Sequence, residues 1–253
     1  MTNDLLLLMP LIIVGAGAIL LMLSSAYEKI SHEMAAYGSA LVFAIAFLVQ
    51  LGSCITGKAV LFSDIFNSFL VVTNFSKAAG LIILACGLFT VMSAQTYFKQ
   101  NTFCSPEFYS LTVFAASGML LLTMAQELIS VFIALEIMSL AIYILVGYNR
   151  KNVISTEAAL KYLMLGAFAG AFLTMGTALV YGATASTKFV AIGKFVAAHG
   201  FLHTPALVGG AFFILVAFLF KVAAFPFHAW VVDVYDGASR SEEHTSELQS
   251  RSE

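Results

Sequence analysis

Residues 217–238, AFLFKVAAFPFHAWVVDVYDGA, place a lysine inside a long run of aliphatic and aromatic residues. An ionisable side chain at the centre of a membrane-spanning helix costs about 2.5 to 3.5 kcal/mol on insertion scales, so Lys221 is a candidate functional residue. Pro226 follows five positions later, and its nitrogen cannot donate a hydrogen bond to the carbonyl of Val222. The stretch therefore predicts a membrane helix that is broken at Pro226, close to a buried ammonium group.

The rest of the chain is similarly apolar. Of its 253 residues, 60% are hydrophobic and 10% are charged, whereas roughly a quarter of the residues in a soluble domain carry charge. Because about 20 apolar residues cross the hydrocarbon core of a bilayer, the sequence predicts an all-α, polytopic membrane helix bundle. We expect about seven transmembrane helices, over residues 5–23, 34–51, 69–93, 108–124, 129–148, 158–181 and 206–232.

Sequence motifs for several other functions are missing. The cysteines, Cys54, Cys86 and Cys104, lack the spacing of a zinc or iron–sulfur site. No GxGxxG follows a strand pattern, and there is neither a P-loop nor a basic cluster, so nothing in the sequence indicates nucleotide or nucleic-acid binding. We therefore expect this chain to bind no cofactor or metal of its own and to have the lipid bilayer as its surroundings.

The final residues, 239–253, read SRSEEHTSELQSRSE and differ abruptly from the apolar sequence before them. The triplet RSE at 240–242 returns at 251–253, and residues 240–250 resemble the translation of a common sequencing adapter. We interpret this tail as foreign to the protein and expect the native sequence to continue beyond residue 238 in another form. The alternative is a genuine polar C-terminus, because the composition alone is typical of a disordered tail.

Charged residues also occur inside other expected helices. Glu136 lies too deep in helix 129–148 for its short side chain to reach water, so it must face neighbouring helices; the alternative to a functional role is a protonated group that only forms hydrogen bonds. Burial favours the neutral amine of Lys221 and a nearby anion favours its ammonium form, so this lysine suits proton exchange, although its long stem could also snorkel. Lys77 is expected to snorkel, and Glu127 to lie at the membrane interface.

Two further residues are candidates for moving protons. Lys161 follows Glu157 by four positions, so an ordinary ion pair on one helix and a role in a proton relay are both open. His228 follows Lys221 by seven positions, which would place both on one face of a continuous helix. Histidine titrates near neutral pH and could continue a relay, but a histidine beside Trp230 in an interfacial aromatic belt is equally consistent with the sequence.

Three stretches together resemble a known family. They are FKVAAFPFHAWVVDVYDGA (220–238), EFYSLTVFAASGMLLLTMAQELISVFIALEIMSLAIYILVGY (107–148) and STEAALKYLMLGAFAGAFLTMGTALVYGAT (155–184). They are similar to the antiporter-like membrane subunits of respiratory complex I, and most similar to subunit N of bacterial NADH:quinone oxidoreductase. The resemblance implies that Glu136, Lys161 and Lys221 are proton-translocation residues, with Glu136 and Lys221 forming an ion pair.

The resemblance also implies an assembly and a location. The partners would be the other membrane and peripheral subunits of a complex that uses NADH, FMN, iron–sulfur clusters and quinone, in the bacterial inner membrane. Because family members contain two inverted repeats, we expect an N-terminal three-helix region (1–107), part of the first repeat (108–238) and the foreign tail (239–253). A subunit of a cation/proton antiporter or a membrane-bound hydrogenase, and an inert membrane scaffold, are the alternative functions.

Overall fold

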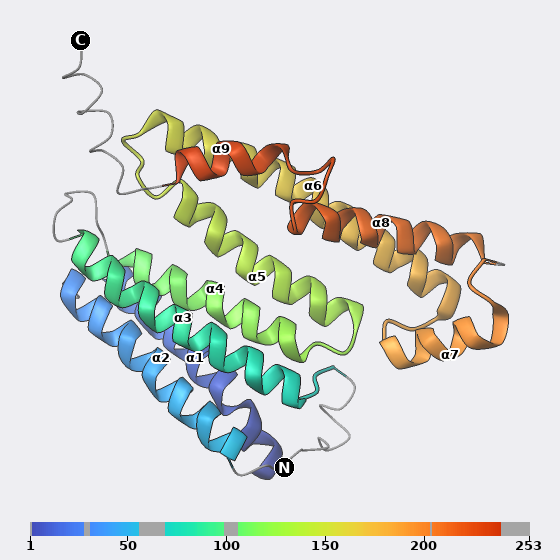
Figure 1. Cartoon of the computed structure of the whole chain (residues 1–253), viewed down its shortest axis with the longest axis horizontal. Helices are drawn as coiled ribbons and strands as arrows, with labels where there is room; N and C mark the ends of the chain where they lie inside the picture. Colours follow the sequence, from blue (N-terminus) through green and yellow to red (C-terminus); the bar gives the residue numbers. More distant parts are fainter. Residues whose placement is uncertain (1, 28–30, 56–68, 99–105, 203, 239–253) are drawn as a thin grey trace.

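The computed structural model describes residues 2–27, 31–55, 69–98, 106–202 and 204–238, and this part of the chain is a bundle of α-helices (Figure 1). The expected all-α membrane bundle is confirmed, because six of the described helices, α1 to α6, are long and apolar enough to cross a bilayer. The predicted tail, 239–253, lies outside the described residues. The helices are α1 (Thr2–Ala26), α2 (His32–Ile55), α3 (Asn74–Phe98), α4 (Glu107–Met124), α5 (Leu128–Val146), α6 (Val153–Thr184), α7 (Phe189–His199), α8 (Pro205–Lys221) and α9 (Ala229–Gly237).

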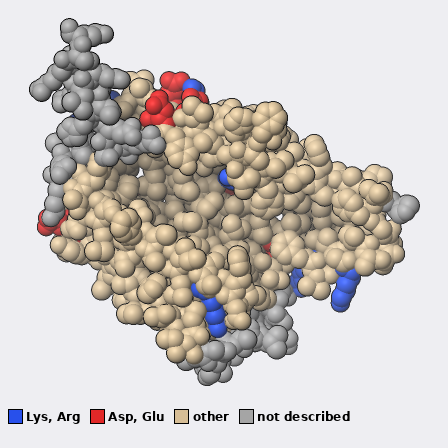
Figure 2. Space-filling model, viewed as in Figure 1, with Lys and Arg blue, Asp and Glu red and all other residues tan. Residues whose placement is uncertain are grey.

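The first four helices pack as a group, and the helices from α5 onward pack one beside the next, starting against α4. Helices α1 to α4 surround a common core, α5 lies against α4, and α6 lies between α5 and the pair α8 and α9 (Figure 1). The outside is also apolar: Leu20, Phe89 and Phe168 are each more than 60% exposed, and few charged side chains appear over the helices in Figure 2. Apolar side chains on both the inner and outer faces are what a helix surrounded by lipid requires.

The seventh predicted helix is interrupted, as the proline indicated. Helix α8 ends at Lys221 and the chain becomes helical again at α9, so residues 222–228, including Pro226, form the break. Ala223 adopts a left-handed backbone conformation (φ 53°), which is unfavourable for a residue with a Cβ atom. The indole Nε1 of Trp230 donates to the carbonyl of Phe220 at 3.2 Å, so an α9 side chain satisfies a carbonyl in the last turn of α8.

Helix α3 begins later than expected, at Asn74 rather than residue 69. Residues 69–71 instead run in an extended conformation beside residues 124–126, and the backbone N–H of Val71 donates to the carbonyl of Met124 at 2.8 Å. Apolar composition could not reveal this, because a short apolar run is compatible with either helix or extended backbone. The pairing holds the turn between α4 and α5 at one end of the bundle.

Candidate functional site

Lys221 is the last residue of α8, and its ammonium group points at α5. Its Nζ donates to the Ser139 hydroxyl at 2.6 Å and to the Tyr143 hydroxyl at 3.3 Å, and lies 5.6 Å from the centre of the Tyr143 ring. The Ser139 hydroxyl donates its own proton to the carbonyl of Leu135, which leaves its lone pairs free to accept from the lysine. Neutral oxygens and an aromatic face therefore hold this partly buried cation inside the bundle.

Glu136 belongs to the same face of α5. Glu136, Ser139 and Tyr143 follow the spacing i, i+3, i+7, which aligns their side chains along one side of the helix. The described ion pairs do not include a direct pair between Glu136 and Lys221; the ammonium binds Ser139, one turn further along α5. The Lys221 ammonium thus contacts the polar stripe one turn away from Glu136, which is part of that stripe.

Two glycines of α6 make room for this stripe. A Cβ atom at Gly170 would lie 3.0 Å from Oε1 of Glu136, and one at Gly166 would lie 2.5 Å from Cζ of Tyr143 and closer still to its hydroxyl. Distances below about 3.0 Å are not tolerated between such atoms without a shift of one partner. Glu136 and Tyr143 are therefore each packed against a glycine of α6, and these two glycines are one turn apart.

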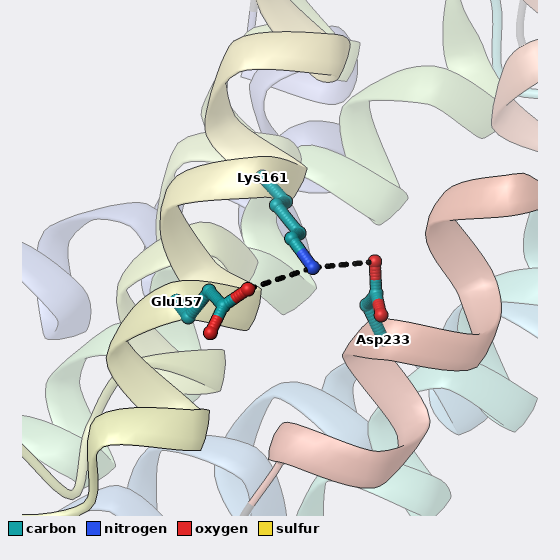
Figure 3. Close-up of polar contacts among 3 residues, drawn as sticks. All are labelled: Glu157, Lys161 and Asp233. Atoms are coloured by element: carbon teal, nitrogen blue, oxygen red, sulfur yellow. Dashed lines mark ion pairs between the residues drawn. The ribbon is translucent and has the colours of Figure 1, made fainter.

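Lys161 lies in a separate ionic cluster. Its Nζ is 2.9 Å from Oε1 of Glu157 on the same helix and 3.2 Å from Oδ2 of Asp233 on α9 (Figure 3). The pair with Glu157 was expected from the spacing, but the pair with Asp233 was not, because it depends on how α9 folds back onto α6. The Lys161 side chain is 44% exposed. The described hydrogen bonds and ion pairs do not connect it to Glu136 or Lys221.

His228 is not on a common helix face with Lys221, so that expectation is wrong. The break at 222–228 separates the two residues, and the seven-residue spacing has no helical meaning across it. His228 is exposed at the start of α9, with its ring 5.7 Å from that of Phe225. Its role in proton transfer stays a prediction.

Two other charged residues are more buried than expected. Lys77 is 3% exposed, and its Nζ donates at 3.2 Å to the carbonyl of Ser53 in the last turn of α2, where the helix dipole favours a cation. Glu127 is 4% exposed, and its Oε2 accepts from the Thr187 hydroxyl at 2.9 Å. The Lys77 side chain therefore does not extend to the surface as snorkelling would require, and the interfacial position of Glu127 stays a prediction. In the described parts of the chain, no three His, Cys, Asp or Glu side chains gather closely enough to hold a metal ion.

The chain is similar to proteins of known families. Residues 125–242 match the model of a transmembrane family described as NADH:quinone oxidoreductase/Mrp antiporter. NADH-quinone oxidoreductase subunit N of Chloroflexus aggregans is 37% identical over 93% of this chain and 48% of the relative. The same-named protein of Gemmatimonas aurantiaca is 36% identical over 91% of this chain and 46% of the relative. This chain thus spans about half the length of these curated relatives.

Solved structures show the same fold. A chain of respiratory complex I from Thermus thermophilus, with bound aureothin, superposes with a TM-score of 0.72 at 31% identity, over 90% of this chain and 47% of that chain. A chain of the Mrp complex from Dietzia sp. superposes with a TM-score of 0.69 at 18% identity, over 93% of this chain and 43% of that chain, which shows a shared fold.

Together, the broken helix, the family match and the relatives define the class that the chain resembles: the antiporter-like transmembrane proteins of NADH:quinone oxidoreductases and Mrp antiporters. Within that family, the predicted resemblance to subunit N of bacterial NADH-quinone oxidoreductase is confirmed. It is a multi-pass protein of the bacterial inner membrane.

Proposed function

We propose that this chain is part of a proton-translocating membrane subunit of NADH:quinone oxidoreductase, and that Lys221 and Glu136 exchange protons during translocation. The observation that carries the proposal is the position of Lys221. Lys221 is the last residue before the break in the seventh predicted helix. Its ammonium group binds two hydroxyl groups on the stripe of α5 that also contains Glu136. Ionisable groups buried between membrane helices mark ion or proton pathways in transport proteins.

The Ser139 and Tyr143 hydroxyls can assist such a transfer. Each hydroxyl has one proton to donate and two lone pairs that accept, so a proton leaving Lys221 has acceptors within hydrogen-bonding distance. The seven-residue break after Lys221 also removes the regular helical constraint on the backbone next to it. Local movement of residues 222–228 could therefore change the contacts of the ammonium group.

The subunit would work within a larger assembly. We propose the other membrane and peripheral subunits of the complex as its partners, and these would bind NADH, FMN, the iron–sulfur clusters and quinone. We also propose that the sequence after residue 238 is foreign to the protein, because its composition changes abruptly there and the triplet RSE repeats within it. Reading the uninterrupted gene beyond that position tests it: continuous coding of the same polar tail would contradict a foreign origin.

A substitution in the full-length subunit tests the proposed function. The Lys221→Ala variant should assemble into the complex and oxidise NADH, but lose NADH-driven proton pumping by this subunit. Lys194→Ala is a matched control, because Lys194 is an exposed lysine on α7. Pumping that is unchanged in Lys221→Ala, with normal assembly of both variants, would contradict the proposal.

A further inference from the structure

Helix α9 contacts α6 through one face, which consists of Trp230, Asp233 and Gly237. These residues have the spacing i, i+3, i+7, which places them on one side of the helix. The Trp230 ring stacks on Tyr162 of α6 with ring centres 4.5 Å apart. A Cβ atom at Gly237 would overlap the Cβ of Ala158, so the backbone of α9 lies directly against α6 there. Successive turns of α9 thus contact α6.

The middle contact of this face is an ion pair. Oδ2 of Asp233 lies 3.2 Å from Nζ of Lys161, and Glu157 holds the same ammonium group at 2.9 Å (Figure 3). Glu157 belongs to the same helix as the lysine, whereas Asp233 belongs to α9. The pair with Asp233 therefore joins the two helices.

Two lines of contact lead from this face to Lys221. The indole of Trp230 donates to the carbonyl of Phe220, the residue before Lys221, at 3.2 Å. In the other direction, Tyr162 packs edge-on against Tyr143 with ring centres 4.6 Å apart, and the Tyr143 hydroxyl accepts from the lysine at 3.3 Å. The two tyrosines are 6% and 7% exposed, and close-packed rings of this kind do not move independently. The position of Trp230 therefore affects both the chain beside the lysine and one of its hydrogen-bond acceptors.

The covalent connection does not fix this geometry by itself. Residues 222–228 form turns between α8 and α9, so no continuous helix sets the direction of α9 relative to Lys221. The contacts between α9 and α6 must therefore determine where Trp230 lies.

We propose that Asp233 is a positioning residue for Lys221. Its ion pair with Lys161 keeps α9 against α6, and Trp230 transmits this restraint to the Lys221 ammonium group. The inference rests on the proposed function, because it names what holds the proton-exchanging lysine against the polar stripe of α5. In the described hydrogen bonds and ion pairs, Asp233 contacts Lys161 and not that stripe, so it acts through the rings between them.

Substitutions of Asp233 in the full-length subunit, within the assembled complex, test this role. Asp233→Asn keeps the size of the side chain but loses its charge, and should lower the number of protons pumped per NADH oxidised towards the value of Lys221→Ala. Asp233→Glu retains the carboxylate and should restore most of that loss. Asp236→Asn is the matched control, because Asp236 is an exposed acid of α9 outside the contact face. Full pumping in Asp233→Asn, with pumping lost in Lys221→Ala, would overturn the inference and leave the proposed function intact.

A double substitution separates positioning from a loss of stability. If Asp233 acts through Lys221, Asp233→Asn should lower the ratio of protons to NADH in the unmodified subunit but should not lower it further in Lys221→Ala. A role in folding alone would reduce the amount of assembled complex and leave the ratio unchanged, which would contradict the inference. An additional loss in the double variant would contradict it too, because Asp233 would then act independently of Lys221.

A variant without proton chemistry separates positioning from proton transfer by Asp233 itself. Gly237→Ala adds a methyl group that overlaps Ala158 and displaces α9 from α6, so it should lower the ratio as Asp233→Asn does. Gly182→Ala is the matched control, because a Cβ atom there has nothing within 4 Å. Equal ratios in the two glycine variants would show that the contact of α9 with α6 does not position Lys221. This comparison decides the question even if Asp233→Asn does not assemble.

Discussion

Adding one methyl group at Gly166 should disturb the Lys221 site without changing a polar residue. In the Gly166→Ala variant, the new Cβ would lie 2.5 Å from Cζ of Tyr143, so the ring must move by several tenths of an ångström or more. Tyr143 is 6% exposed, and its ring packs edge-on against Tyr162 at 4.6 Å, which restricts that movement. Overpacking of this kind costs about 1 to 3 kcal/mol.

Gly182→Ala is the matched control on the same helix. A Cβ at Gly182 has nothing within 4 Å, so this variant gains only the helix propensity of alanine, worth up to about 1 kcal/mol. Since both variants gain that propensity, their difference isolates the clash with Tyr143. For a chain of this size, about 1 to 3 kcal/mol corresponds to a difference in melting temperature of roughly 2 to 12 °C, with Gly166→Ala lower.

The single tryptophan provides the assay. Trp230 stacks on Tyr162 with ring centres 4.5 Å apart and an interplanar angle of 6°, so its fluorescence reports on the aromatic cluster that contains Tyr143. Thermal unfolding of each variant in detergent should be followed at the tryptophan emission. A melting temperature for Gly166→Ala equal to or above that of Gly182→Ala would refute the close packing of Tyr143 against α6.

Three further substitutions test other contacts between elements of the structure. Trp230→Phe keeps an aromatic ring but loses the indole N–H, so the free energy of unfolding should fall by about 0.5 to 1.5 kcal/mol in a denaturant titration; an unchanged midpoint would argue against this hydrogen bond. Asp233→Asn removes the ion pair that joins α9 to α6, and limited proteolysis should cut residues 222–228 faster than in the control Asp236→Asn. Equal cleavage of the two variants would show that the pair does not restrain α9. Thr187→Val withdraws a hydroxyl from the buried carboxyl group of Glu127 and should lower stability by about 1 to 3 kcal/mol, whereas no loss would mean that this contact is not formed in the membrane.

The sequence was most informative where a single residue imposes a physical constraint. A proline inside an apolar helix cannot complete the hydrogen-bond pattern, so the break around Pro226 was predictable. The depth of Lys221 within its apolar run similarly predicted a cation held inside the bundle. Both constraints act within one segment and need no knowledge of its neighbours.

Contacts between helices were harder to predict, because they depend on how each helix rotates against its partner. The resemblance implied that Lys221 pairs directly with Glu136, but its ammonium binds Ser139 and Tyr143. The spacing of the α5 stripe could have indicated these hydroxyls, since all three side chains share one face. The contact of Lys161 with Asp233 had no such local signal, because the break in the seventh helix decides where α9 lies.

The central claim is that Lys221 itself carries a proton, and the most direct test compares two replacements that differ in this ability. The measurement is the number of protons pumped per NADH oxidised by the assembled complex, with Lys221→His or Lys221→Met in the full-length subunit. Histidine can gain and lose a proton near neutral pH and methionine cannot. We predict a lower ratio for Lys221→Met and at least partial recovery for Lys221→His. Equal ratios in Lys221→Met and the unmodified complex would contradict the claim.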